Sequence, residues 1–139
     1  MSVLPNPLPL KVLDGEYAVH KLAEWQDVPL HAMQSGFSSL VVMNEEITLI
    51  CPATVAVKAT HSSNSWCVIR VDALLDHSLV GVLAGISSVL AEEKVSIFAL
   101  SSWETDYILV QSDQLDLACR ALEIAGHPLS IGPNSVKIF

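Results

Sequence analysis

The second half of the chain alternates between short apolar runs and stretches in which apolar residues recur every three or four positions. Short β-branched runs predict strands, because side chains of a buried strand are apolar over four to eight residues. A three-and-four spacing predicts an amphipathic helix with one buried face. The predicted elements are strand 66–71, a helix with the stripe Leu79, Val82, Leu83, Ile86 and Leu90, strands 95–100 and 106–110, a helix with the stripe Leu115, Ala118, Leu122 and Ala125, and edge strand 135–139.

Polar residues and glycine mark where these two helices begin and end. Asp76-His77-Ser78 and Ser112 stand ahead of the two stripes, and their side-chain oxygens are suited to cap the first free backbone N–H groups. Gly126 followed by Pro128 predicts the end of the second helix, because glycine accepts the left-handed turn and proline cannot continue a helix.

The order strand, helix, strand, strand, helix, strand is that of the ferredoxin-like fold. Right-handed crossovers would then place both helices on one face of a four-stranded sheet. We therefore predict an α+β fold with a complete ferredoxin-like βαββαβ unit at residues 65–139.

The first 64 residues contain strand patterns but no helix of ordinary length. Runs 8–13 and 17–22 flank the tight-turn dipeptide Asp14-Gly15, and runs 37–43 and 47–51 flank Asn44-Glu45, so each pair suggests a hairpin. Residues 28–32 and 52–58 allow one helical turn each at most, and residues 60–64 suggest a polar linker.

A weak internal repeat relates the two halves. Shifting the chain by about sixty positions lays Leu40–Cys51 over Ala99–Val110, with Glu45 on Glu104. Residues 1–64 are therefore predicted to be a degenerate copy of the C-terminal unit, with shrunken helices.

The composition limits the kinds of binding partner that we expect and indicates the cellular compartment of the protein. The 139 residues are 51% hydrophobic and carry a net charge of −8, which disfavours binding to the phosphates of nucleic acid. No apolar run approaches the roughly 18 residues of a membrane span. Three widely spaced cysteines, and an N-terminus without a basic segment before an apolar one, predict free thiols and a cytoplasmic protein.

Residues that could carry catalysis or bind a metal are sparse. The five histidines lack metal-ligand spacing, and no phosphate-binding or nucleophile-elbow motif is present. Asp72 and Asp76 either share a cation or belong to a strand end and a helix cap. Cys51 is either a nucleophile or a buried apolar thiol, and no neighbouring base favours the first alternative. We therefore predict a protein that is not an enzyme and uses no metal or cofactor.

Two features suggest ligand binding. Gly81, Gly85 and Ser88 form a small-residue stripe, which allows either close packing or a ligand carboxylate at the N-terminus of the helix. Asp106 opens an otherwise apolar strand, where it either caps the hairpin turn or binds an ammonium group.

At these positions the sequence resembles the ACT-domain family, in particular its small tandem-ACT proteins. The resemblance is carried by SLVGVLA at residues 78–84, by VSIFALSSWETDYILV at residues 95–110, and by Ile50-Cys51-Pro52 at the close of the first half. The same branch is similar to the amino-acid-sensing modules of aspartate kinases and of the cytosolic arginine sensors of animal growth signalling.

The resemblance implies a regulatory module that binds an amino acid or similar small molecule between ACT units. A homodimer and a regulated target are the expected partners, and the sequence identifies neither the oligomeric state nor the target. An interaction module that keeps the fold for dimer or partner contact, without a ligand, is the alternative. The ligand-contacting residues implied are Leu79, Val80 and Gly81 at the helix start, and Ala99, Leu100, Ser101 and Asp106 on the hairpin.

Overall fold

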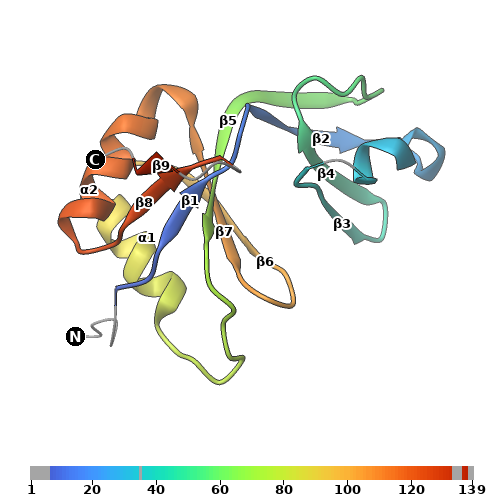
Figure 1. Ribbon diagram of the computed structural model, residues 1–139. Coiled ribbons are helices and arrows are strands. Elements are labelled where there is room, and N and C mark those ends of the chain that lie inside the picture. The colour runs from blue at the N-terminus through green and yellow to red at the C-terminus, as the bar shows by residue number, and fades with distance from the viewer. Residues whose placement is uncertain (1–6, 35, 133–135, 138–139) are drawn as a thin grey trace. The chain divides into compact units, whose positions relative to one another are not determined.

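The computed structural model describes residues 7–34, 36–132 and 136–137 (Figure 1). By their internal contacts these residues form two compact units. One comprises Gly15–Trp66, and the other combines the described residues up to Asp14 with those from Cys67 onwards. The predicted division at 64/65 differs from these units chiefly in the first fourteen residues, because a short N-terminal strand pairs within the C-terminal unit.

The C-terminal unit has a mixed sheet in the order β6-β7-β5-β1-β8-β9. In a ferredoxin-like sheet the strands follow the order second, third, first, fourth, and here β6, β7, β5 and β8 hold those positions. Strand β1 is inserted between β5 and β8, antiparallel to the first and parallel to the second. The strands are β1 (Leu10–Val12), β5 (His61–Val71), β6 (Ile97–Ser101), β7 (Asp106–Gln111), β8 (Leu129–Ile131) and β9 (Val136–Lys137).

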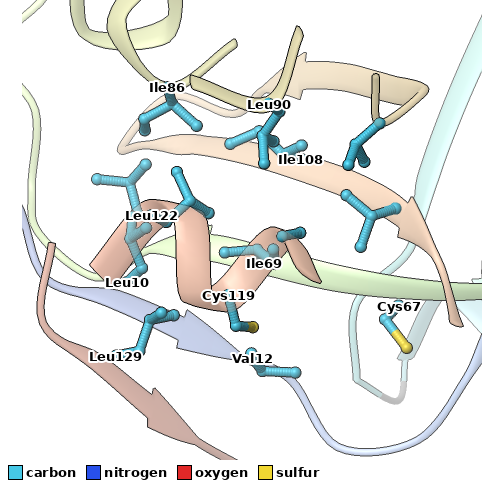
Figure 2. Close-up of a cluster of buried hydrophobic side chains, with 14 of the residues drawn as sticks. Leu10, Val12, Cys67, Ile69, Ile86, Leu90, Ile108, Cys119, Leu122 and Leu129 are labelled. Carbon is cyan, nitrogen blue, oxygen red and sulfur yellow. The ribbon is translucent and has the colours of Figure 1, made fainter. Parts of the chain in front are cut away.

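Two helices, α1 (Val82–Glu92) and α2 (Leu115–Ile124), pack with these strands around one hydrophobic cluster (Figure 2). Ile86 and Leu90 of α1 and Leu122 of α2 are fully buried, as are Ile69 of β5 and Ile108 of β7. Burying a side chain of this size stabilises the fold by about 1.5–3 kcal/mol, so the cluster anchors both helices to the sheet.

The N-terminal unit has the strand order β3-β4-β2-β5, which is again second, third, first, fourth. Its strands are β2 (Tyr17–Leu22), β3 (Ser39–Met43), β4 (Glu46–Pro52) and the first part of β5. The 3-10 turns η1 (Trp25–Asp27) and η2 (Leu30–Gln34) stand where the first helix of such a unit would be, and residues 53–60 join β4 to β5 without a helix.

Both units therefore follow the ferredoxin-like order, and the predicted fold class is confirmed. The C-terminal unit is complete and the N-terminal one has lost its helices. The β3/β4 hairpin and its turn at Asn44 are also confirmed, since Met43 pairs with Glu46 and Asn44 has a φ of 52°.

Three predictions of local structure are wrong. Residues 61–64 of the predicted linker 60–64 are the start of β5, which pairs with β2 along an exposed stretch where polar side chains face water. The helix after β5 begins at Val82 rather than near Ser78, because Gly81 is its N-cap in the left-handed conformation. Ser112 opens the short 3-10 turn η3 (Ser112–Gln114), and α2 starts only at Leu115.

The strand predictions at the two ends of the chain also need correction. Residues 10–12 pair with β5 and β8 and not with β2, so Asp14-Gly15 does not close a hairpin. The fourth strand of the C-terminal unit is β8, which precedes the predicted 135–139 run. Of that run, Val136–Lys137 pairs with β8 as β9, and residues 135 and 138–139 lie outside the described residues.

Candidate functional site

A pocket of about 220 Å³ lies within the C-terminal unit, between the segment that leads into α1 and the tip of the β6/β7 hairpin. Both walls come from parts of the chain that follow a strand of the sheet, so the core beneath holds them in place. The pocket is lined by Leu75, Asp76, His77, Leu79, Val82, Ser101, Ser102, Trp103, Glu104, Thr105 and Asp106.

The hairpin tip is a four-residue loop, Ser102 to Thr105, closed by the paired residues Ser101 and Asp106. The Ser102 N–H donates to the Thr105 carbonyl at 2.8 Å, and the Ser101 hydroxyl donates to Oδ1 of Asp106 at 2.5 Å. Thr105 is buried, and its hydroxyl donates to the Val71 carbonyl at 2.7 Å. The tip is thus fastened to the end of β5.

Two hydrogen bonds fasten the segment before α1 to the hairpin tip. The Leu75 N–H donates to the Glu104 carbonyl at 2.8 Å, and Nε2 of His77 lies 2.7 Å from the Trp103 carbonyl. The rings of His77 and Trp103 also meet edge to face, with their centroids 4.5 Å apart. The two hydrogen bonds and the ring contact all join the two walls, so they hold the walls of the pocket in a fixed position relative to each other.

Asp76 organises the turn that leads to the helix. Its Oδ1 accepts hydrogen bonds of 2.8 Å from both the N–H and the hydroxyl of Ser78. These two bonds, with a smaller contribution from His77, hold the pKa of the Asp76 carboxyl below its usual range. The group therefore stays ionised in neutral solution.

The N-terminus of α1 adjoins this turn. Its N-cap, Gly81, has a φ of 84° and no side chain that could accept a bond from the first-turn N–H groups. Val82, the first residue of α1, lines the pocket. Free N–H groups and the helix dipole together favour a negative ligand group at this end.

The structure brings three of the seven predicted ligand-contacting residues to the pocket wall, namely Leu79, Ser101 and Asp106. Val80 is 84% exposed, and with Gly81 it lies beside the pocket lining in sequence but not within it. Ala99 and Leu100 lie further along β6 and are also outside the lining.

Sequence reasoning missed the remaining wall residues as parts of a site. The sequence suggests Asp76 as a cap or a cation ligand and His77 only as part of the capping segment, and it suggests no role in a site for Trp103 or Glu104. Their contacts to the opposite wall run largely through backbone carbonyls, which leave no pattern in a sequence. The signal available in the sequence was a tryptophan within the polar loop tip at residues 101–105, and in the structure Trp103 is 81% exposed.

Other candidate chemistry finds little support. Within the described ranges, no three His, Cys, Asp or Glu residues gather as a metal ion would require. Cys51 is buried, and desolvation raises the pKa of its thiol, as the interpretation of a buried apolar thiol requires. In the part of the chain that the structure describes, no helix is long and apolar enough to cross a membrane.

In a comparison with protein families, the model of the ACT domain matches residues 61–123. That span contains both walls of the pocket. No functionally curated protein matches the sequence.

Solved structures with the same fold cover almost the entire chain. A protein from Agrobacterium tumefaciens matches with a TM-score of 0.79 and 24% identity over 90% of this chain and 93% of that one. The ligand-free regulatory subunit of aspartate kinase from Thermus thermophilus matches with a TM-score of 0.56 and 11% identity over 91% of this chain and 100% of that one. A putative C-terminal regulatory domain of aspartate kinase from Porphyromonas gingivalis matches with a TM-score of 0.52 and 15% identity over 84% of this chain and 94% of that one.

Proposed function

We propose that the protein is a non-catalytic regulatory module for an amino acid, because the ACT-domain model matches residues 61–123 and the chain has the fold of aspartate kinase regulatory modules. ACT domains are regulatory modules that often bind amino acids. The single observation that carries the proposal is the pocket between the start of α1 and the hairpin tip.

Two parts of the pocket, the start of α1 and Asp106, suit the two charged groups that every free amino acid carries. The N-terminus of α1 would hold the carboxylate, because its free N–H groups and dipole favour an anion. Asp106 would hold the ammonium group, and its bond from Ser101 fixes the carboxylate in position. Leu79 would contact the ligand's apolar part from the pocket wall.

The other residues implied by the family resemblance would contribute less directly. Gly81 would present its backbone at the helix start, and Val80 would contact the outer face of the bound ligand. Ala99 and Leu100, on β6, would contact it only if a second ACT unit closes over the hairpin. We propose that a second copy of the chain supplies that unit, so that ligand binding shifts how copies pair.

The alternative is an interaction module without a ligand. It is favoured by exposed apolar side chains close to the pocket in sequence, Leu74 at 76%, Val80 at 84% and Trp103 at 81%. In that case Val80→Ser would weaken self-association or partner binding, and amino acids would have no effect on either.

A thermal-shift screen of the full chain against the twenty amino acids at millimolar concentration tests the proposal. A ligand at about 100 times its Kd adds about 2.7 kcal/mol of stability, which raises the melting temperature by several degrees. We expect a response that disappears in Asp106→Asn. A uniformly flat screen would favour the interaction module instead.

A further inference from the structure

Strand β3 (Ser39–Met43) is an unprotected edge of the sheet. Among the described residues it pairs on one side only, with β4, and that pairing is regular, without a bulge. The strand contains no proline and no charged residue. Prolines, charges and bulges are the devices by which proteins keep an edge strand from pairing with another chain. The outer backbone N–H and C=O groups of β3 are therefore available to a further strand.

Apolar side chains are exposed on both faces of this strand. Val41 is 58% exposed and Met43 65%, and Val42, which points to the opposite face, is 40% exposed. A single apolar residue on a surface needs no explanation, but three in succession along an edge strand form a continuous apolar border. A strand that pairs with β3 would cover these side chains together with the backbone groups.

The distribution of charge favours a second copy of the chain as the source of that strand. Each chain carries a net charge of −8, so two copies repel each other unless the surfaces that meet are uncharged. Residues 28–44 contain no Asp, Glu, Lys or Arg, and this is the longest such stretch in the sequence. Because β3 lies within that stretch, two copies can meet there with little electrostatic repulsion.

A two-fold axis at Val41 would pair the whole strand with itself. In the antiparallel arrangement Val41 faces Val41 of the second copy, and Leu40 faces Val42. Ser39 and Met43, the two ends of the strand, then also face each other. An axis at either neighbouring residue would leave part of the strand without a partner.

The acidic residues nearest to β3 stay apart in this arrangement. Glu45 and Glu46 follow one end of the strand, and in an antiparallel pair those of the two copies lie at opposite ends. A five-residue strand is about 13 Å long, which exceeds the Debye length of roughly 8 Å at physiological ionic strength. The same surface is used on both copies, so the contact closes at a dimer and does not grow into a filament.

We propose that the protein forms a homodimer in which β3 pairs antiparallel with β3 of a second copy. The contact lies in the N-terminal unit and includes no residue of the pocket, so it needs no bound amino acid. It therefore does not rest on the proposed function, and it is separate from the contact proposed above at the β6/β7 hairpin.

Analytical ultracentrifugation of the full chain, at micromolar concentrations and without added amino acid, tests the proposal. We expect a wild-type dimer. Dimerisation should be at least about tenfold weaker in Val41→Lys and in Val41→Glu, because two like charges would then face each other across the axis. Mixing these two variants should restore the dimer, since a lysine would face a glutamate. Val41→Thr keeps a β-branched side chain without charge and should dimerise as the wild type does.

Phe98→Lys is the matched control on β6, an edge strand of the C-terminal unit where Phe98 is 42% exposed. It should leave the dimer intact, and unchanged circular dichroism spectra would show that each variant folds.

Three results would overturn the proposal. The first is a wild-type monomer, or a dimer that Val41→Lys leaves intact. The second is loss of the dimer in Phe98→Lys, which would place the contact at β6. The third is a mixture of Val41→Lys and Val41→Glu that stays monomeric, because residue 41 would then not face its own copy. Each of these results leaves the proposed amino-acid binding to the thermal-shift screen.

Discussion

The hydroxyl of Ser101 donates a 2.5 Å hydrogen bond to Oδ1 of Asp106, across the last residue pair of the β6/β7 hairpin. The bond fixes an acidic side chain on the pocket wall, at a position where a strand meets its turn. Removing the donor and removing the charge therefore have different expected consequences.

We expect Asp106→Asn to abolish the thermal response to the amino acid that stabilises the wild-type chain. Ser101→Ala should weaken binding by less, roughly three- to tenfold, because the carboxylate keeps its charge but loses its positioning bond. Titration calorimetry measures both effects. Asp113→Asn, at an exposed residue of η3, is the matched control and should bind as wild type does.

Thr105→Val should destabilise the C-terminal unit by about 1 to 3 kcal/mol. The substitution preserves shape but removes the buried hydroxyl that donates to the Val71 carbonyl at 2.7 Å. Urea unfolding measures the change in free energy. Thr105→Ser keeps the hydroxyl and should lose clearly less stability, and equal losses in the two variants would show that this hydrogen bond is unimportant.

Gly81→Ala should cost about 1 to 2 kcal/mol, because a φ of 84° places a Cβ too close to the following carbonyl. Gly81→Asn should be far milder, since asparagine tolerates this conformation and can cap a helix. Thermal unfolding of the two variants decides between this account and close packing. If packing alone required glycine, the larger asparagine would be the more damaging.

The N-terminal unit should lose stability in acid through His20. Its Nδ1 lies 2.7 Å from the Ser62 hydroxyl, and its Nε2 is buried without a hydrogen-bond partner among the described residues. Desolvation lowers the pKa of His20 below its usual value of 6.5, so the unfolded chain binds a proton more readily than the folded chain. Stability should therefore fall as the pH drops below 6.5, until the folded state also becomes protonated.

Urea unfolding at pH 7 and pH 5 measures this dependence. His20→Asn keeps a polar atom near Ser62 and should reduce the loss of stability between the two pH values. His61→Asn, at an exposed position of β5, is the control and should behave as wild type does. An equal pH dependence in wild type and His20→Asn would rule out His20 as its source.

The three thiols should resist alkylation in the folded protein at pH 8. All are buried, and desolvation, with smaller effects from Asp116, Cys67 and Glu123, raises the pKa of Cys119 to about 11. At pH 8 roughly a thousandth of that thiol is ionised, and only the thiolate reacts. Mass spectrometry after iodoacetamide treatment should find no label without denaturant. Rapid native labelling of Cys51 would revive the idea of a cysteine nucleophile.

The elements that the sequence predicted correctly are those in which a periodic apolar pattern and the tertiary packing agree. Ile86 and Leu90 recur at helical spacing and are buried in α1. The start of that helix was misplaced because Asp76 and Ser78 form a local turn with the same side-chain chemistry as a cap. The left-handed N-cap at Gly81 has no such signature.

Local sequence patterns did not predict which strands pair when these are far apart in the chain. Asp14-Gly15 is a good turn dipeptide, yet β1 pairs with residues near 70 and 130 in the sequence. The candidate site shows the same limit. Asp106 was identifiable as a charge that opens an apolar strand, whereas Trp103 and Glu104 joined the site through carbonyl contacts to residues about 30 positions earlier.

Amide chemical shifts of the full chain, followed by NMR while the responding amino acid is titrated in, test the central claim most directly. We predict that the largest changes fall at residues 75–82 and 101–106, the two walls of the pocket. Changes centred elsewhere in the chain, or no changes with any of the twenty amino acids, would contradict the account.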